Sequence, residues 1–186
     1  MKKNKGLIII LGIILLVAAM IVPKYNKLVK LDNDVDAAYS QIQVVVKRRA
    51  DLIPNLVNVV KGYATHEEET FIKVTEARNS VEKATNAEEL AKANDELTGA
   101  INNLNVVVES YPELKANTNF LDLQAQLEGT ENRISTERGR YNNTVKEYNE
   151  VVRSFPMNLF AKMFGFEKKA YFEISSEDEK LPEVKF

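Results

Sequence analysis

Few side chains in this sequence are of the types that usually carry out catalysis or hold metal ions. The chain of 186 residues contains one histidine, His66, and no cysteine. The absence of cysteine excludes disulfides, thiolate metal sites and cysteine nucleophiles. A single imidazole also lacks the further histidine or cysteine ligands of a typical zinc site. The acidic run 67–69 beside it is more typical of a helix start, where negative charge is favourable. We therefore expect neither a metal ion nor another cofactor.

Sequence motifs for enzymatic chemistry are missing as well. The sequence contains no Gly-rich phosphate loop, nucleophile elbow or evident pair of catalytic carboxylates. Its net charge of −2 is unevenly distributed along the chain. Residues 1–30 carry six lysines and no acid, which leaves 19 basic and 27 acidic side chains, a net −8, for the other 156 residues. Because these motifs are missing, we expect a protein that is not an enzyme. Because phosphate backbones repel an acidic body, we also expect that it does not bind nucleic acid.

The remaining candidates for a site are polar side chains that interrupt stripes of apolar residues. At 1.5 Å per residue, four of the five fall at a similar depth in an up-down bundle, and Glu131 falls higher. Buried guanidinium groups need carboxylate partners, because an unpaired buried charge costs several kcal/mol. We predict a polar layer that fixes the register of the helices, with a ligand or signalling site inside the bundle as the alternative. The five residues are Arg49, Arg78, Asn94, Glu131 and Arg138.

Four long helices would position this layer. The first carries a 3-4 apolar repeat with the 3.5-residue period of a left-handed coiled coil. Capping signals at Thr65–Glu68, Thr85–Glu89 and Asn117–Asn119 predict the starts of three further helices. Short connections between long amphipathic helices predict an antiparallel up-down arrangement. The stripe of the first helix comprises Leu28, Leu31, Val35, Ala38, Ile42, Val45, Arg49, Leu52, Leu56, Val59 and Tyr63.

The N-terminal segment has the properties of a membrane span. The seventeen residues that begin with Gly6 and Leu7 and end with Val22 carry no charge and have lysines on both sides. As a helix this run would extend about 26 Å, just enough to cross a bilayer. A cleavable signal peptide is the alternative, with Val17-Ala18-Ala19 as a weak small-residue site. We expect an uncleaved single-pass anchor whose partner is the lipid bilayer. Lysines on the two sides nearly balance, and the MKKNK start favours an extracytoplasmic bundle.

The C-terminal segment differs from the bundle because it is short and aromatic, with an acidic end at 175–186. One interpretation is that Leu159, Phe160, Met163 and Phe164 cap the open end of the bundle. The other is an interfacial segment that touches the membrane. Because only one lysine lies within this stretch, we favour packing against the bundle.

The sequence thus predicts an all-α protein with three parts. An N-terminal transmembrane helix occupies residues 1–23 and an antiparallel four-helix bundle occupies 24–155. An aromatic and acidic tail occupies 156–186.

Several motifs resemble those of the LemA family. The most specific is the block from Arg48 to Val57, RRADLIPNLV, and further matches are Tyr111–Asn117, Leu127–Ile134 and the closing Val184-Lys185-Phe186. The resemblance implies a bacterial single-pass membrane protein with an N-terminal anchor and an antiparallel helical bundle. It supplies no biochemical activity. The motif residues that we single out are Arg48, Arg49, Asp51, Pro54 and Asn55.

Together these features favour a scaffold or protein-interaction module at the bacterial cell membrane, with other membrane or envelope proteins as partners. A sensory or ligand-binding membrane module and a hydrolase accessory are the alternatives.

Overall fold

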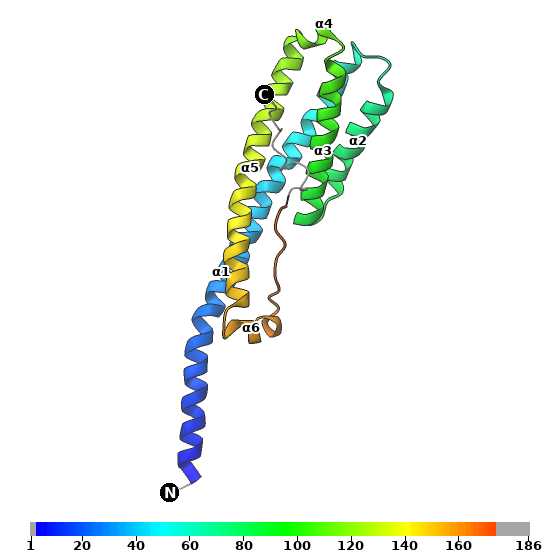
Figure 1. Cartoon of the computed structure of the whole chain (residues 1–186). Coiled ribbons are helices and arrows are strands. Elements are labelled where there is room, and N and C mark those ends of the chain that lie inside the picture. Colours follow the sequence, from blue (N-terminus) through cyan, green and yellow to red (C-terminus); the bar gives the residue numbers. More distant parts are fainter. Residues whose placement is uncertain (1–2, 174–186) are drawn as a thin grey trace, which may run out of the picture. The chain divides into compact units, whose positions relative to one another are not determined.

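The computed structural model describes residues 3–173, and every regular element in this range is a helix (Figure 1). This confirms the all-α prediction. The acidic C-terminal stretch, with the Val184-Lys185-Phe186 motif, lies outside the described residues. The elements are α1 (Lys3–Lys61), α2 (Glu68–Lys83), α3 (Ala87–Val108), α4 (Pro112–Lys115), α5 (Thr118–Arg153), α6 (Met157–Phe160) and the 3-10 turn η1 (Lys162–Phe164).

The chain folds into two compact units, each built from two parts of the sequence. Within the described residues, the first unit comprises 3–38 and 142–169. The second unit comprises 39–141 and 170–173. The two long helices α1 and α5 therefore each contribute to both units.

The second unit is a helical bundle. It contains the C-terminal part of α1, the hairpin of α2 and α3, and the N-terminal part of α5, with α4 in the connection that precedes α5 (Figure 1). Each helix buries one apolar stripe, as expected for amphipathic helices in a bundle. The fully buried side chains at its centre include Ile53, Leu56, Leu97, Leu104 and Ile134.

The buried stripe of α1 is shifted at alternate positions from the one that the sequence predicted. In the second unit it runs from Ile42 to Val60, still in steps of four and three residues. Ile42, Arg49 and Leu56 lie on the predicted stripe, and between them burial falls one residue later than predicted. The predicted stripe positions Val45, Leu52 and Val59 are consequently only half-buried. The buried stripe comprises Ile42, Val46, Arg49, Ile53, Leu56 and Val60, and Ala50 and Val57 beside it are also buried.

The predicted helix starts are partly confirmed. Asn86 caps α3 by accepting a hydrogen bond from the Glu89 backbone N–H (2.9 Å), and the Glu89 carboxylate accepts one from the Thr85 N–H (2.8 Å). Asn117 Oδ1 accepts a hydrogen bond from the Phe120 N–H at the start of α5 (3.1 Å). The prediction of a capping box at Thr65 is wrong, because α2 begins at Glu68 with Glu67 as its N-cap and without a side-chain cap.

The first unit corrects the favoured interpretation of the aromatic segment. Met157 and Ala161 are buried, but Leu159 is 66% exposed and Met163 is 70% exposed. Phe164 is also exposed, and Phe160 is half-buried. The prediction that this segment caps an apolar core is therefore wrong for most of its large side chains.

The capping geometry makes a testable distinction between two helix starts. Replacing Asn86 with alanine removes the acceptor for the Glu89 N–H, so we expect the free energy of unfolding to fall by about 1 kcal/mol. Thr65→Ala should have little effect, because Thr65 caps no helix in this fold. Thermal unfolding of the full chain in detergent, followed by circular dichroism, checks both variants. An equal loss for Thr65→Ala would mean that the expected capping box forms after all.

Candidate functional site

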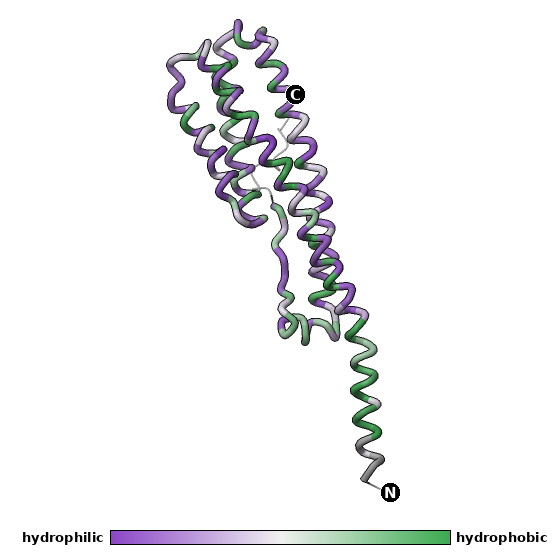
Figure 2. Tube along the Cα trace, turned by 180° about the vertical axis from the view of Figure 1, so that it is seen from behind, coloured by the Kyte–Doolittle hydropathy of each residue, from purple (hydrophilic) through white to green (hydrophobic). Residues whose placement is uncertain are grey.

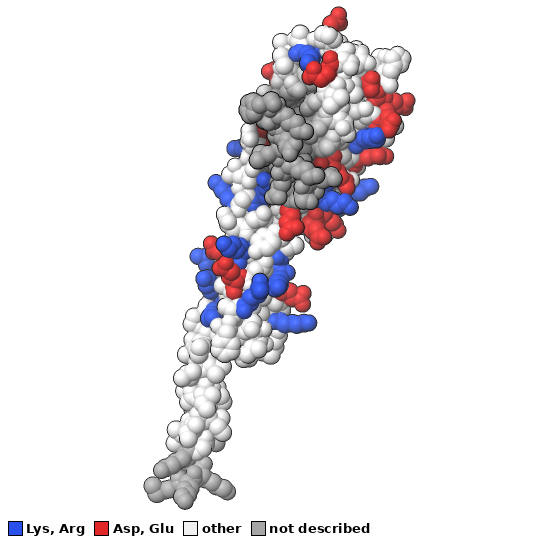
Figure 3. All heavy atoms as spheres, viewed as in Figure 1, with Lys and Arg blue, Asp and Glu red and all other residues white. Residues whose placement is uncertain are grey.

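The first candidate site is the apolar segment of α1 from Gly6 to Val22. Large side chains along it are exposed, for example Ile8 at 67%, and no part of the most apolar stretch is buried. Figure 2 shows this part of α1 as the most hydrophobic portion of the chain, and Figure 3 shows no acidic or basic side chain along it. Soluble proteins rarely expose so large a continuous apolar surface. The helix is long and apolar enough to cross a membrane.

The end of this segment is tied to the C-terminal part of the first unit. Lys24 Nζ donates a hydrogen bond to the Phe155 carbonyl (2.6 Å) and another to Ser154 Oγ (3.3 Å). The Tyr25 ring packs edge-on against Phe164 and Phe166, with centroid distances of 5.3 and 5.8 Å. The apolar part of α1 is thus joined to the aromatic segment immediately after the last apolar turn.

The second candidate site is a buried polar cluster around Arg49 in the second unit. Arg49 is only 4% exposed. Its Nη1 donates hydrogen bonds to Thr98 Oγ1 (2.8 Å) and Asn94 Oδ1 (3.2 Å), and it lies 2.6 Å from Glu131 Oε2. The cluster therefore connects three helices, with Arg49 on α1, Asn94 and Thr98 on α3, and Glu131 on α5.

The electrostatics of this cluster favour a structural role. Burial lowers the pKa of the Arg49 guanidinium, and the Glu131 carboxylate opposes that shift. A guanidinium nevertheless stays charged at physiological pH, so Arg49 needs its carboxylate partner. The Glu131 side chain is 41% exposed, so water reaches part of it and reduces the cost of the pair, although Oε2, the oxygen that faces Arg49, is buried. Because its positive charge is already paired, the cluster is suited to connecting helices and poorly suited to binding an anionic ligand.

The structure brings together three of the five residues that the sequence assigned to the polar layer: Arg49, Asn94 and Glu131. Arg78 instead pairs with Glu82 on its own helix at 2.6 Å. Arg138 is half-buried on α5, two turns beyond Glu131. Sequence reasoning missed Thr98, although its position one turn after Asn94 places both on the same face of α3.

A third polar contact, in the first unit, was also missed. Lys169 Nζ lies 2.7 Å from Asp32 Oδ1 and 2.8 Å from Asp36 Oδ1, and 5.5 Å from the centre of the Tyr148 ring. Partial burial alone would lower the pKa of Lys169, but hydrogen bonds and charges from the two aspartates raise it. Two aspartates one turn apart repel each other unless a cation lies between them, and this spacing was a usable signal.

The polar residues of the RRADLIPNLV block divide between core and surface. Arg49 belongs to the buried cluster, whereas Arg48, Asp51, Pro54 and Asn55 are exposed. Spacings of three and four residues place Arg48, Asp51 and Asn55 on one side of α1. Packing in the core therefore does not account for these exposed side chains.

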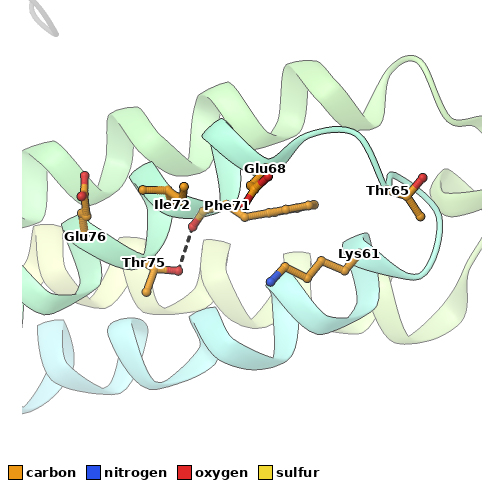
Figure 4. A pocket seen from close by; sticks show the side chains of 7 residues that line it. All are labelled: Lys61, Thr65, Glu68, Phe71, Ile72, Thr75 and Glu76. Atoms are coloured by element: carbon orange, nitrogen blue, oxygen red, sulfur yellow. Dashed lines mark hydrogen bonds between the residues drawn. The ribbon is translucent and has the colours of Figure 1, made fainter.

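A groove of about 500 Å³ lies between the end of α1 and the start of α2 (Figure 4). Lys61 Nζ lies 5.3 Å from the centre of the Phe71 ring, and Thr75 Oγ1 donates to the Phe71 carbonyl (2.8 Å). The Thr75 hydroxyl is thus engaged with the helix backbone, and the lining offers no imidazole to activate a nucleophile. The lining residues are Lys61, Thr65, Glu68, Phe71, Ile72, Thr75 and Glu76.

Metal-binding geometry is absent from the part of the chain that the structure describes. No group of three or more histidine, aspartate or glutamate side chains in this part lies where it could hold a metal ion. The described side chains therefore give no support to a metal-dependent reaction.

Fold and sites define an all-helical protein whose N-terminal helix has the length and composition of a membrane span. The model of the LemA family matches residues 38–186. The chain belongs to the LemA family. Magnetosome protein MamQ 2 of Paramagnetospirillum magneticum is 24% identical over 190 residues, which cover 88% of this chain and 70% of that protein. Protein LemA of Metamycoplasma hominis is 28% identical over 158 residues, which cover 83% of this chain and 71% of that protein.

The polar cluster predicts unequal effects of removing its two charges. Glu131→Leu leaves a buried guanidinium without its carboxylate, so we expect the free energy of unfolding to fall by about 2 kcal/mol. Arg49→Met leaves a carboxylate that water can reach and fills the buried space, so stability should be unchanged or higher. Thermal unfolding of the full chain in detergent measures both effects.

Glu69→Leu provides a control, because the Glu69–Lys73 pair on α2 is exposed and should contribute much less than the buried pair. If Glu131→Leu were no more harmful than Glu69→Leu, the cluster would not stabilise the bundle.

Proposed function

We propose that this protein is a single-pass protein of the bacterial cell membrane whose helical bundle binds other membrane or envelope proteins. The observation that carries the proposal is the apolar segment of α1, of which no part of the most apolar stretch is buried. The helix continues from this segment through Pro23 without a break. Water is a poor solvent for such a surface, whereas hydrocarbon is a good one. Apart from the Ala19 carbonyl, which has no donor at Pro23, the helical backbone of this segment can satisfy its own hydrogen bonds, as a membrane span must.

The side chains of the second unit fit a binding role better than a catalytic one. The charge of Arg49 is paired inside the bundle, and the groove beside Phe71 lacks a nucleophile with an adjacent base. The names of the relatives state no enzymatic activity. These observations support a scaffold that presents protein surfaces at the membrane.

The charge on α2 and α3 indicates the kind of surface that a partner would present. These helices together carry eight acidic and four basic side chains. Figure 3 shows acidic side chains gathered over them. Complementary charge speeds association and selects partners, so we propose a partner with a basic surface. The lysine-rich start of the chain favours an extracytoplasmic position for the bundle.

The membrane anchor has a direct test. We expect the full chain to stay in the membrane fraction after alkaline carbonate extraction and to be released only by detergent. Deleting residues 1–23 should move the chain into the soluble fraction. Release of the full chain by carbonate would contradict the proposed span.

The binding role can be tested by photocrosslinking in native membranes. A photoreactive amino acid at Glu96, which is exposed on α3, should capture a reproducible partner protein. The same amino acid at Gln126, which is exposed on α5, is the matched control. Protein-specific products from position 96 and none from 126 would support the acidic face as the binding surface. No products from position 96 would contradict it.

A further inference from the structure

The exposed apolar side chains of the C-terminal segment form a surface that the fold leaves uncovered. Phe155 and Met163 are each 70% exposed, and Leu159 and Phe164 lie near them in sequence, also exposed. We call these four residues, Phe155, Leu159, Met163 and Phe164, the apolar ledge. Single exposed hydrophobic residues are ordinary, but four within ten residues mark a surface that contacts something other than water.

The backbone beneath the ledge is well held. Met157 and Ala161 are buried and anchor it to the first unit. The Ala161 N–H donates to the Met157 carbonyl (2.7 Å), and the Phe166 N–H donates to the Ala161 carbonyl (2.9 Å). Gly165 ends η1 with φ 81°, a left-handed conformation that glycine adopts without strain. The ledge is thus a shaped surface and not a loose strand of apolar residues.

The position of the ledge within the first unit identifies what covers it. The hydrogen bond from Lys24 to the Phe155 carbonyl and the ring contacts of Tyr25 hold the segment against α1. Lys24 and Tyr25 follow Val22, the last residue of the apolar run, by two and three positions. Figure 1 shows α6 beside α1 where the apolar part of the helix ends, on the side away from the N-terminus. The ledge is therefore continuous with the surface that the proposed anchor buries in lipid.

The charges around the ledge agree with a lipid surface. Residues 155–166 contain one basic side chain, Lys162, and no acid. Lys24 and Lys27 lie on the neighbouring turns of α1, where they share a groove with Glu147 and Glu150 of α5. Because these glutamates offset the lysines, we expect attraction to anionic headgroups to contribute little to membrane binding by the ledge. Insertion of apolar side chains into the bilayer surface would be the main contribution.

We propose that the apolar ledge inserts into the interfacial layer of the same bilayer that α1 spans. This inference rests on the proposed membrane anchor. The protein would then contact the membrane twice, through a helix that crosses it and through a short segment that lies in its surface. The second contact restrains rotation of α1 about its own axis and fixes which side of the first unit faces the lipid.

The absence of tryptophan from the sequence makes a clean fluorescence test available. Three full-length variants carry one tryptophan each: Leu159→Trp on the ledge, Ile14→Trp in the apolar segment and Val106→Trp on α3. Val106 is the matched control, because it is an equally exposed apolar residue in the second unit. Each variant is placed in nanodiscs of phosphatidylcholine, at one chain per disc, containing lipids brominated either near the glycerol or near the chain ends.

The expected results separate the three positions. Leu159→Trp should show blue-shifted emission and strong quenching by the shallow bromines. Ile14→Trp should be quenched by the deep bromines, and Val106→Trp should emit as in water without quenching. Replacing phosphatidylcholine by phosphatidylglycerol should change the Leu159→Trp signal little, because apolar insertion dominates.

Other outcomes overturn the inference in distinguishable ways. Quenching of Ile14→Trp without quenching of Leu159→Trp would leave the anchor intact and refute the ledge contact. If neither were quenched, the proposed anchor itself would fail. Blue-shifted but unquenched Leu159→Trp would mean that protein covers the ledge, as in a second copy of the chain, and would also refute lipid insertion.

A second variant tests whether the ledge acts as one surface. With the tryptophan at Phe155→Trp, the added substitutions Leu159→Asn and Met163→Asn should reduce its quenching, because two of its apolar neighbours are lost. Both replaced side chains are largely exposed, so the helical content in circular dichroism should not change. Unchanged quenching would show that Phe155 meets lipid independently of Leu159 and Met163, and it would refute the ledge as one inserted surface.

Discussion

The exposed apolar surface of α1 is unfavourable in water, so the whole molecule depends on an apolar environment for this segment. The backbone groups of Gly6–Val22, apart from the Ala19 carbonyl, can pair inside the helix. The segment therefore loses few hydrogen bonds in hydrocarbon, and the transfer of its apolar side chains out of water is favourable. Pro23 removes the hydrogen bond that would otherwise reach the Ala19 carbonyl. At the end of a span, that carbonyl is close enough to headgroups and water to be satisfied. The proline therefore falls where a continuous helix can best tolerate it.

In each unit, a cation contacts oxygen atoms from other segments of the chain. In the second unit, Arg49 of α1 contacts α3 and α5 through two neutral oxygens and one carboxylate. In the first unit, Lys169 reaches Asp32 and Asp36 of α1, and its backbone N–H donates to Asn149 of α5 (3.0 Å). Such contacts add specificity, because a slipped helix would leave a charge partly buried and unpaired. Apolar packing alone tolerates sliding much better.

Local signals in the sequence predicted the fold well, and relations between helices were harder. The apolar run and the caps at Asn86 and Asn117 depend on a few neighbouring residues. The stripe of α1 was misplaced because Val45-Val46, Leu52-Ile53 and Val59-Val60 offer apolar side chains in both registers. Arg78 and Arg138 were assigned because they interrupt apolar stripes at a similar depth, but both are only half-buried in the structure. Of the predicted layer, only Arg49, Asn94 and Glu131 point toward one another at the same level of the bundle.

Two of the exposed surfaces, the acidic face of α2 and α3 and the apolar ledge, differ in their expected interaction with lipid. Acidic side chains on α2 and α3 are repelled by anionic headgroups, although screening at physiological salt limits this effect to about 8 Å. The ledge has no acid between 155 and 166, so nothing opposes its insertion. A chain with both surfaces exposed to water would carry an apolar patch with no partner. In the arrangement that we propose, lipid covers that patch, and the acidic helices remain available to a basic protein.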